Sequence, residues 1–336
     1  MTAPTDSCGL FDAAARVPER TELALLAVQD AALPSAENAT SIVVVGNGAA
    51  GFAARVVEMT ASASCAVPVV AAIDGVLPAW VGSRSLVVVL DHGEAAHRTC
   101  RVVDVAAALG ATVVAATVVG PVHDRVRATG GTVITLDTGT TVARAALGAL
   151  CAAPLVVLDR LGFLPGAGPA LDHAVRQLHR RRDELVAPVN VARTLARRIG
   201  RSIPLVTGGD AVGRLAAVRW KQQCNVNAKI PAFASALPEL AFDEIAGWGQ
   251  HGDVTRQVLT SVLLRHRYER AEVADAFARL VPALEESLVA VHMVEAAGEG
   301  PLAQLLDLAY IGDFVSLELA AQEDLDPGPA PALDLL

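Results

Sequence analysis

The sequence predicts an α/β protein with two doubly wound, parallel-sheet domains of the Rossmann-like kind. The composition is 53% hydrophobic but only 4% aromatic, which suits helices that pack tightly on sheets. Short apolar runs alternate with helical segments in the first half of the chain, and the same pattern begins again after residue 200. With 336 residues, the chain is long enough for two such domains.

The first half starts with a predicted helix at 21–33 and a short apolar strand, Ser41–Val45, that ends in a glycine turn. A buried strand, a glycine turn and the start of a helix are the expected order at a βα junction. Four further apolar runs have the spacing of parallel strands and predict strands at 68–73, 85–90, 112–118 and 132–136. Helices are expected after Glu94, up to Leu109, and over 141–151.

The segment 163–169 is rich in Gly and Pro and is the best candidate for a domain boundary. A basic helix with the cluster 179–182 follows, and we interpret these arginines as a solvated helix face or a domain contact. Beyond it the sequence predicts helices at 187–199, 269–280 and 302–321, strands at 203–207, 258–265 and 288–293, and a helix carrying Trp220 after the turn 208–210. The expected domains are therefore 1–155 and 188–336, with a linker and the basic helix at 156–187.

Charge and cysteine usage limit the kinds of partner. The formal net charge of −9 argues against a nucleic-acid partner, because phosphate backbones are bound through clustered positive charge. The five cysteines contain no C-x-x-C pair, so we expect buried thiols in a reducing cytoplasm. No signal peptide is recognisable at the N-terminus. The apolar run 105–122 is interpreted as a helix end and a core strand, and not as a membrane span.

Gly46-x-Gly48-x-x-Gly51 follows a strand and opens a helix, and Asp74 ends the next strand. Taken alone, this spacing predicts a nicotinamide or flavin enzyme, because the dinucleotide fingerprint has these glycines and an acidic residue about 20 positions further on. A phosphate or a sugar can use the same helix N-terminus. Tight backbone packing without any ligand is the other alternative.

The stretch Arg219–Lys229 holds the only two lysines among the 27 Lys and Arg residues, with several amide side chains between them. Such a density of hydrogen-bonding groups predicts a polar site or a buried polar network. We assign Lys221, Gln222 and Asn225 to the network, and Asn227 and Lys229 to the candidate site.

Segments in both halves of the chain show a resemblance to one family. They are Pro78-Ala-Trp80, Arg144-Ala-Ala-Leu-Gly148, Pro188-Val-Asn-Val-Ala-Arg-Thr-Leu-Ala196, Ile203-Pro-Leu-Val-Thr-Gly208, the stretch Arg219–Lys229, Leu237-Pro-Glu-Leu-Ala-Phe-Asp-Glu-Ile245 and Tyr310-Ile-Gly-Asp-Phe-Val-Ser316. On these residues the chain resembles the bifunctional phosphoglucose/phosphomannose isomerase family. The resemblance implies two sugar-isomerase (SIS) domains, a homodimer, no metal or cofactor, and interconversion of aldose and ketose 6-phosphates.

The chain departs from the family at the residues that do the chemistry. The resemblance implies a glutamate base at the position of Val226 and a ring-opening histidine at the position of Phe242. It also implies serines in the phosphate cradle, where this chain has Ala50 and Leu90-Asp91-His92-Gly93, and Asp91 would repel a phosphate. Arg144 matches the family. The expected ligand-binding residues are therefore Gly46, Gly48, Ala50, His92, Gly93, Arg144, Asn227 and Lys229, with no metal ligand.

Replacement proton-transfer groups are available near these positions. Asp243 and Glu244, beside Phe242, are the candidates for catalytic groups, and Asp210, His92 and His97 are further possibilities. Asp243 and Glu244 also fit the role of helix-start caps. Glu94 with His97 fits a surface pair better than half of a metal site.

These observations lead to a primary hypothesis and three alternatives. The primary hypothesis is a catalytically degenerate, cytoplasmic and homodimeric member of the family that binds a sugar phosphate or sugar derivative as a sensor or accessory protein. The alternatives are an active isomerase with relocated catalytic groups, a dinucleotide-binding oxidoreductase, and a structural protein whose cleft is filled by Val226, Phe242 and Leu90. No metal, nucleic acid or membrane is expected as a partner.

Overall fold

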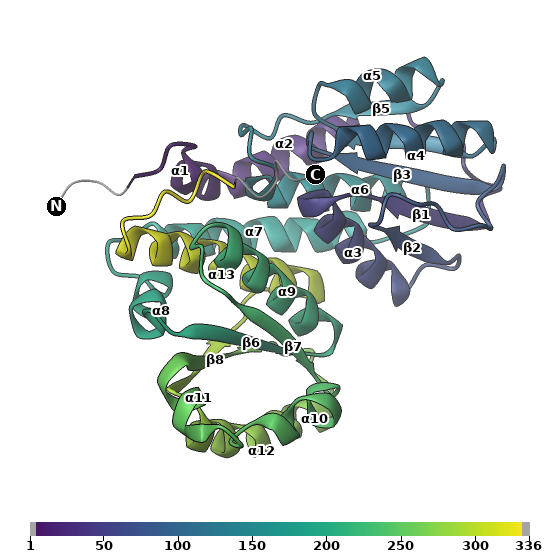
Figure 1. The fold of residues 1–336 in the computed structure, drawn as a ribbon. Helices are drawn as coiled ribbons and strands as arrows, with labels where there is room; N and C mark the ends of the chain where they lie inside the picture. Colours follow the sequence, from purple (N-terminus) through teal and green to yellow (C-terminus); the bar gives the residue numbers. More distant parts are fainter. Residues whose placement is uncertain (1–4, 331–336) are drawn as a thin grey trace. The chain divides into compact units, whose positions relative to one another are not determined.

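The structure, a computed structural model, describes residues 5–330, which form two compact units (Figure 1). The N-terminal unit comprises residues 16–172, and the C-terminal unit comprises residues 173–330 together with 5–15. Helix α7 (Ala167–Leu185) begins in the first unit and continues into the second. Each unit is built on one parallel sheet with helices on both faces, which confirms the predicted fold class.

The N-terminal unit contains a five-stranded sheet of order β2-β1-β3-β4-β5 in which each neighbouring pair is parallel. The five predicted strands are confirmed within about two residues: β1 (Ser41–Val45), β2 (Val69–Ala72), β3 (Ser85–Asp91), β4 (Thr112–Thr117) and β5 (Thr132–Thr135). The helices are α2 (Val17–Gln29), α3 (Gly48–Ser62), α4 (Ala96–Ala108), α5 (Pro121–Ala128) and α6 (Leu147–Arg160). The helix predicted over 141–151 is wrong at its start, because a short 3-10 turn, η1 (Ala143–Ala145), precedes α6.

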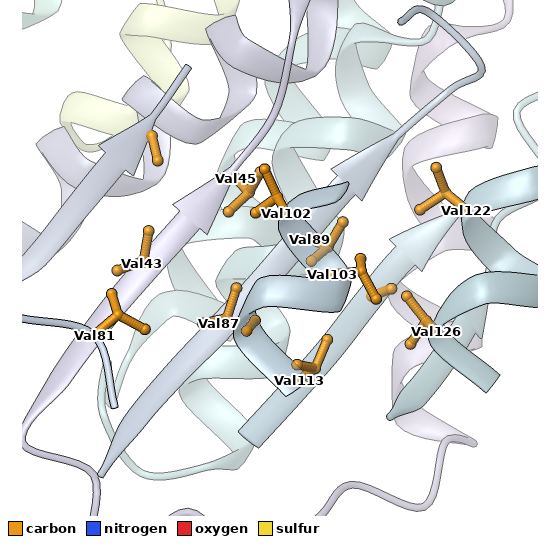
Figure 2. Close-up of a cluster of buried hydrophobic side chains, with 13 residues drawn as sticks. Val43, Val45, Val81, Val87, Val89, Val102, Val103, Val113, Val122 and Val126 are labelled. Atoms are coloured by element: carbon orange, nitrogen blue, oxygen red, sulfur yellow. The ribbon is translucent and has the colours of Figure 1, made fainter. Parts of the chain in front are cut away.

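Two layers of helix bury the faces of this sheet. Successive side chains of a strand point to opposite faces, and Val43, Val45, Val87 and Val89 share one face with residues of α4 and α5 (Figure 2). The helices α3 and α6 pack on β3 from the other face. Strands that are apolar on both faces are expected in a sheet covered on both sides.

The C-terminal unit contains a four-stranded parallel sheet of order β7-β6-β8-β9. Its strands are β6 (Ile203–Gly209), β7 (Phe233–Leu237), β8 (Leu259–Arg265) and β9 (Ala290–Glu295). Its helices are α1 (Leu10–Ala15), α8 (Val191–Ile199), α9 (Asp210–Val226), α10 (Leu240–Asp243), α11 (Gly252–Val258), α12 (Ala271–Ser287) and α13 (Pro301–Gln322), with a 3-10 turn η2 (Ile245–Gly247). Strand β7 and the helices α1, α10 and α11 are elements of this unit that the sequence analysis did not predict.

Helix α13 forms the centre of the C-terminal unit. Every residue from Leu302 to Ala320 is buried, and the helix packs against α8 and α9. Its three buried acids each pair with an arginine: Asp307 with Arg181 of α7, Asp313 with Arg219 of α9, and Glu318 with Arg193 of α8. The interpretation of the 179–182 cluster as a solvated face is therefore wrong for Arg181, whose guanidinium is committed to a buried carboxylate.

Two further expectations of the sequence analysis have definite outcomes. The run 105–122 forms the end of α4 and strand β4, as predicted, and its last two residues begin α5, which was not predicted. No helix within residues 5–330 is long and apolar enough to cross a bilayer. The expectation of buried thiols is right for Cys151 and Cys224, but wrong for Cys8, which is exposed.

Candidate functional site

The turn after β1 has the backbone geometry of a ligand-binding glycine turn. A β-carbon on Gly46 would lie 2.5 Å from the backbone of Ala50, so only glycine allows so tight a turn. Gly48 has a φ of +54°, which favours glycine. A β-carbon on Gly51 would lie 3.1 Å from the carbonyl oxygen of Gly46. These roles are the ones that the three glycines of a dinucleotide or phosphate turn perform.

This turn lies where the order of the sheet reverses direction. Strand β1 lies between β2 and β3, and in open parallel sheets ligands bind beyond the carboxyl ends of the strands at such a switch point. The turn after β1 and the turn after β3 therefore share one edge of the sheet. Asn47 of the first turn donates a hydrogen bond to the hydroxyl of Thr99, 3.2 Å away, at the start of α4.

Glu94, in the turn after β3, reaches back to the N-terminus of α3. The amide of Ala49 donates a hydrogen bond to Glu94 Oε2 at 3.1 Å, and a β-carbon on Gly48 would collide with the same oxygen. The interpretation of Glu94 and His97 as a surface pair is therefore wrong. The carboxylate of Glu94 is a ligand of the helix end, because the free amides there attract negative charge.

Asp91, the last residue of β3, is only 4% exposed. Its Oδ2 accepts a hydrogen bond from the amide of Gly93 at 2.9 Å. Burial raises the pKa of Asp91 to about 6, the negative charge of Glu94 adds to this rise, and hydrogen bonds from Gly93, Thr99 and Thr117 oppose it. The carboxyl group therefore titrates near neutral pH.

His92, the next residue in the sequence, is also buried. Its Nε2 lies 2.8 Å from the hydroxyl oxygen of Thr138, and that hydroxyl donates to the carbonyl oxygen of Thr140 at 3.1 Å. Since the hydroxyl proton is used there, Nε2 must be the protonated nitrogen and Nδ1 the bare acceptor. Nδ1 is buried and has no hydrogen-bond partner among residues 5–330. Burial lowers the pKa of His92, so the ring is a neutral acceptor at neutral pH.

The other predicted ligand residues of the N-terminal unit lie around the same edge. Ala50 is buried in the first turn of α3, and Gly93 is exposed with a φ of +91°. Arg144 lies on η1, which packs against α3. The structure thus brings Gly46, Gly48, Ala50, His92 and Gly93 together around the switch point.

The segment around Val226 ends helix α9 in the C-terminal unit. Val226 is its last residue and is half-buried. The amide nitrogen of the Asn227 side chain donates to the Ser316 hydroxyl at 2.9 Å and to the Gln223 side-chain oxygen at 3.2 Å. The amine of Lys229 donates to the carbonyl oxygen of Val226 at 2.8 Å, which caps the negative end of the helix.

A buried polar network does exist here, but with other members than expected. Lys221 and Gln222 are exposed, so their assignment to the network is wrong. Gln223 and Asn227 are its members, and Trp220 Nε1 donates to the carbonyl oxygen of Leu308 at 2.7 Å. Helix α9 packs against α13, and the residues of one helix face recur every three or four positions. Residues 219, 220, 223 and 227 are therefore buried, whereas 221 and 222 face the solvent.

Asp243 is the last residue of the short helix α10, and Glu244 follows it as the N-cap residue of η2 without making a side-chain capping hydrogen bond. Asp243 is exposed, and Glu244 accepts a hydrogen bond of 2.6 Å from the hydroxyl of Ser235 on β7. Phe242 is 86% exposed. The alternative in which Phe242, Val226 and Leu90 fill a cleft is therefore wrong for Phe242, because so exposed a side chain fills no cleft.

A second glycine turn follows β6 in the C-terminal unit. A β-carbon on Gly208 would collide with the backbone of Gly213, and Asp210, the first residue of α9, has a φ of +50°. His266, just after β8, donates from Nε2 to the carbonyl oxygen of Gly209 at 3.0 Å. The sequence analysis missed His266, although a histidine directly after a predicted core strand was a visible signal. Within residues 5–330, no group of three His, Cys, Asp or Glu is arranged to hold a metal ion.

Comparison with known proteins gives similarity over both units. Residues 188–336 match the family model described as the bacterial phospho-glucose isomerase C-terminal SIS domain. A bifunctional phosphoglucose/phosphomannose isomerase of Caldicellulosiruptor bescii is 26% identical over 333 residues, which is 97% of each chain. One of the same name from Aquifex aeolicus is 29% identical over 140 residues, 42% of this chain and 43% of that protein.

Solved structures share the fold. A glucosamine-6-phosphate deaminase of Thermotoga maritima superimposes with a TM-score of 0.70 at 10% identity, covering 96% of both chains. A glucose-6-phosphate isomerase like protein of Thermus thermophilus gives a TM-score of 0.58 at 23% identity, covering 94% of this chain and 96% of that one. At these identities the likeness concerns the fold alone.

Proposed function

Because the chain belongs to the bifunctional phosphoglucose/phosphomannose isomerase family, we propose that it retains the fold but has lost the isomerase reaction. It serves as a sensor or accessory protein that binds a sugar derivative. The observation that carries this proposal is the segment 225–229, where the position of the family's base is Val226. A hydrocarbon side chain cannot take a proton, and its polar neighbours Asn227 and Lys229 make structural hydrogen bonds.

The chemistry explains why this loss matters. Aldose–ketose isomerisation needs a base that moves a proton between two adjacent carbons and a second group that opens the ring. Phe242 stands at the second position and has no proton to transfer. Each missing general acid or base costs on the order of 10² to 10⁴ in rate. Two such losses remove most of the acceleration of an enzyme.

The residues expected to bind the substrate phosphate, in the N-terminal unit, support the same proposal. The resemblance places the cradle serines at the positions of Ala50, Leu90 and His92, and Asp91 lies between the last two. Asp91 and Glu94 add negative charge near the N-terminus of α3, where a substrate phosphate would need positive potential. We therefore propose a ligand without a tightly held phosphate.

The direct test is an isomerase assay on the purified full chain. Fructose 6-phosphate is incubated with the protein, and glucose 6-phosphate and mannose 6-phosphate are measured by coupled enzymes. We expect no conversion above the blank. Conversion that Glu244→Gln or Asp243→Asn abolishes would overturn the proposal and support the alternative.

That alternative is an active isomerase with relocated catalytic groups. It is favoured by one contact, because the hydroxyl of Ser235 fixes the carboxylate of Glu244 at 2.6 Å, as a positioned acid–base group requires. Asp243 is the neighbouring candidate. The alternative predicts activity that Ser235→Ala lowers and that Ala241→Ser, a change at a neighbouring exposed position, leaves unchanged.

The assembly and location of the protein are part of the proposal. We infer a cytoplasmic homodimer, from the family relation, with no nucleic-acid or membrane partner. Light scattering should then give twice the chain mass of 34.7 kDa. A mass of one chain at micromolar concentration would contradict the homodimer.

A further inference from the structure

Helix α3 begins at the point where this fold can hold an anion. It starts at the β1/β3 switch point, and the free amides of its first turn carry partial positive charge. Its N-cap residue, Asn47, makes no capping hydrogen bond, and its first turn contains no acidic residue. The first turn therefore has no compensating negative charge of its own.

Glu94 supplies that charge from a different part of the sequence. It lies 45 residues from Ala49, whose amide donates to Glu94 Oε2 at 3.1 Å. The same oxygen lies where a β-carbon of Gly48 would be. In dinucleotide turns the second glycine lets the backbone approach a phosphate oxygen, whereas here it admits the oxygen of a side chain.

We propose that Glu94 is a built-in anion that occupies the phosphate position of the N-terminal unit, and that it thereby selects against phosphorylated ligands. The inference deepens the proposed function and rests on it only for the class of ligand. A phosphate would have to displace a carboxylate that is tethered next to the helix end, and a tethered group competes at an effective concentration of about millimolar or higher. The buried carboxyl group of Asp91, which already interacts unfavourably with Glu94, would repel the phosphate in addition.

The same geometry bears on the oxidoreductase alternative. A dinucleotide places its pyrophosphate on the N-terminus of the helix that follows the glycine turn. With Glu94 in that place, the wild-type chain should show no thermal shift with NAD or NADP.

The test uses sulfate, whose charge stays at two negative units across the neutral pH range. Its affinity is measured by isothermal titration calorimetry for the wild-type chain, for Glu94→Ala and for Glu58→Ala. Glu58 is a matched control in the same unit, because its Oε1 also accepts a backbone hydrogen bond at 3.1 Å, from Ala71 of β2 and not from a helix end. We expect Glu94→Ala to bind sulfate at least 10-fold more tightly than the wild type, and Glu58→Ala to match the wild type.

Two further variants make the test decisive. Asp91→Asn is combined with Glu94→Ala, so that the carboxylate of Asp91 cannot repel sulfate and hide the gain in affinity that the loss of Glu94 produces. Ala49→Pro is added to the Glu94→Ala chain, because proline lacks the N–H yet is accepted in the first turn of a helix, and it should remove the gain. If neither Glu94→Ala nor the double variant gains affinity, or if Glu58→Ala gains as much, the proposal is overturned.

Failure of this inference can be distinguished from failure of the proposed function. Isomerase activity of the wild-type chain would refute the loss of the reaction and leave the sulfate result unaffected. Equal sulfate binding by all chains, with no isomerase activity, would refute the role of Glu94 alone.

Discussion

Asp91 is the residue whose environment has the clearest consequence for stability. Its folded pKa of about 6 lies above the ordinary value of 3.8, so between these values the folded chain binds a proton that the unfolded chain releases. Stability therefore falls as pH rises from about 4 to about 6, and the cost persists at neutral pH. A difference of this size corresponds to at most about 3 kcal/mol.

Asp91→Asn removes this cost and keeps an oxygen that can accept from the amide of Gly93. We expect the variant to be more stable than the wild type at pH 7.5, by up to about 3 kcal/mol, and equal to it near pH 4. Urea denaturation at both pH values measures the difference. An equal difference at the two pH values would show that the charge of Asp91 is not its cause. Asp74→Asn is the control, at the exposed carboxylate that follows β2.

At the residue scale, the sequence predicted which residues lie at the candidate site better than it predicted their hydrogen-bond partners. Gly46, Gly48 and His92 were expected ligand-binding residues from the resemblance, and the structure brings them together because a βα turn and the end of a neighbouring parallel strand meet at one sheet edge. The contact between Glu94 and Ala49 was not foreseen, since the two residues are 45 positions apart and no local pattern links them. Its signal was only an acidic residue in the turn next to the switch point.

At the scale of elements, helix α13 shows a role of arginine that lysine could not fill. Arg219 and Asp313 are both nearly inaccessible, and two parallel hydrogen bonds of 2.8 and 2.9 Å join them. The planar fork of arginine matches a carboxylate in this way, which the single ammonium of lysine cannot do. The two lysines, in contrast, are both exposed, and Lys229 needs only to reach carbonyl oxygens at a helix end.

Breaking this pair should destabilise the C-terminal unit. Arg219→Met leaves the carboxylate of Asp313 buried without its partner, which typically costs about 3–5 kcal/mol. Arg201→Met is the control, because Arg201 is 86% exposed and its pair with Glu323 spans 3.4 Å, so its loss should cost about 0–1 kcal/mol. Fluorescence of Trp220, which is fully buried against α13, follows the unfolding in urea.

The double variant Arg219→Met/Asp313→Leu separates burial of an unpaired charge from loss of packing. Because apolar pairs of similar volume often replace buried ion pairs without loss, it should recover most of the stability. If it remains as unstable as Arg219→Met, the deficit comes from packing and not from the charge.

Helices and strands were predictable where the residue composition of a segment and its hydrophobic periodicity indicated the same structure. Strands β1, β3 and β8 are short segments rich in Val, Leu and Ile, and their burial on both faces matches the apolar pattern from which they were predicted. Strand β7, Phe233-Ala-Ser-Ala-Leu237, was missed because alanine and serine are weak strand formers. It lies at the edge of its sheet, where pairing with β6 and not propensity decides the backbone.

For the whole molecule, the positions at which the resemblance implied other residues are distributed over both units. Val226 and Phe242 belong to the C-terminal unit, whereas Ala50, Leu90 and His92 belong to the N-terminal unit. A fold of two parallel sheets follows from the pattern of apolar runs, which is independent of these positions. The sequence could therefore predict the fold without determining which reaction the chain performs.

This distribution predicts that no single reversion restores isomerisation. Val226→Glu returns the base at a half-buried position, and Phe242→His returns the ring-opening group at a position that is 86% exposed, so the fold should tolerate both. We expect each variant, and the two combined, to convert no fructose 6-phosphate, because the phosphate position still holds Glu94 and lacks its hydroxyl groups.

The measurement is the coupled assay, with Val226→Gln as the control of equal size that cannot act as a base. Activity should first emerge when Glu94→Ala and Leu90→Ser are added to Val226→Glu and Phe242→His, because the substrate must be held before its proton can be moved. Turnover by Val226→Glu alone would contradict this, since it would mean that the N-terminal unit still binds the sugar phosphate and that only the base had been lost.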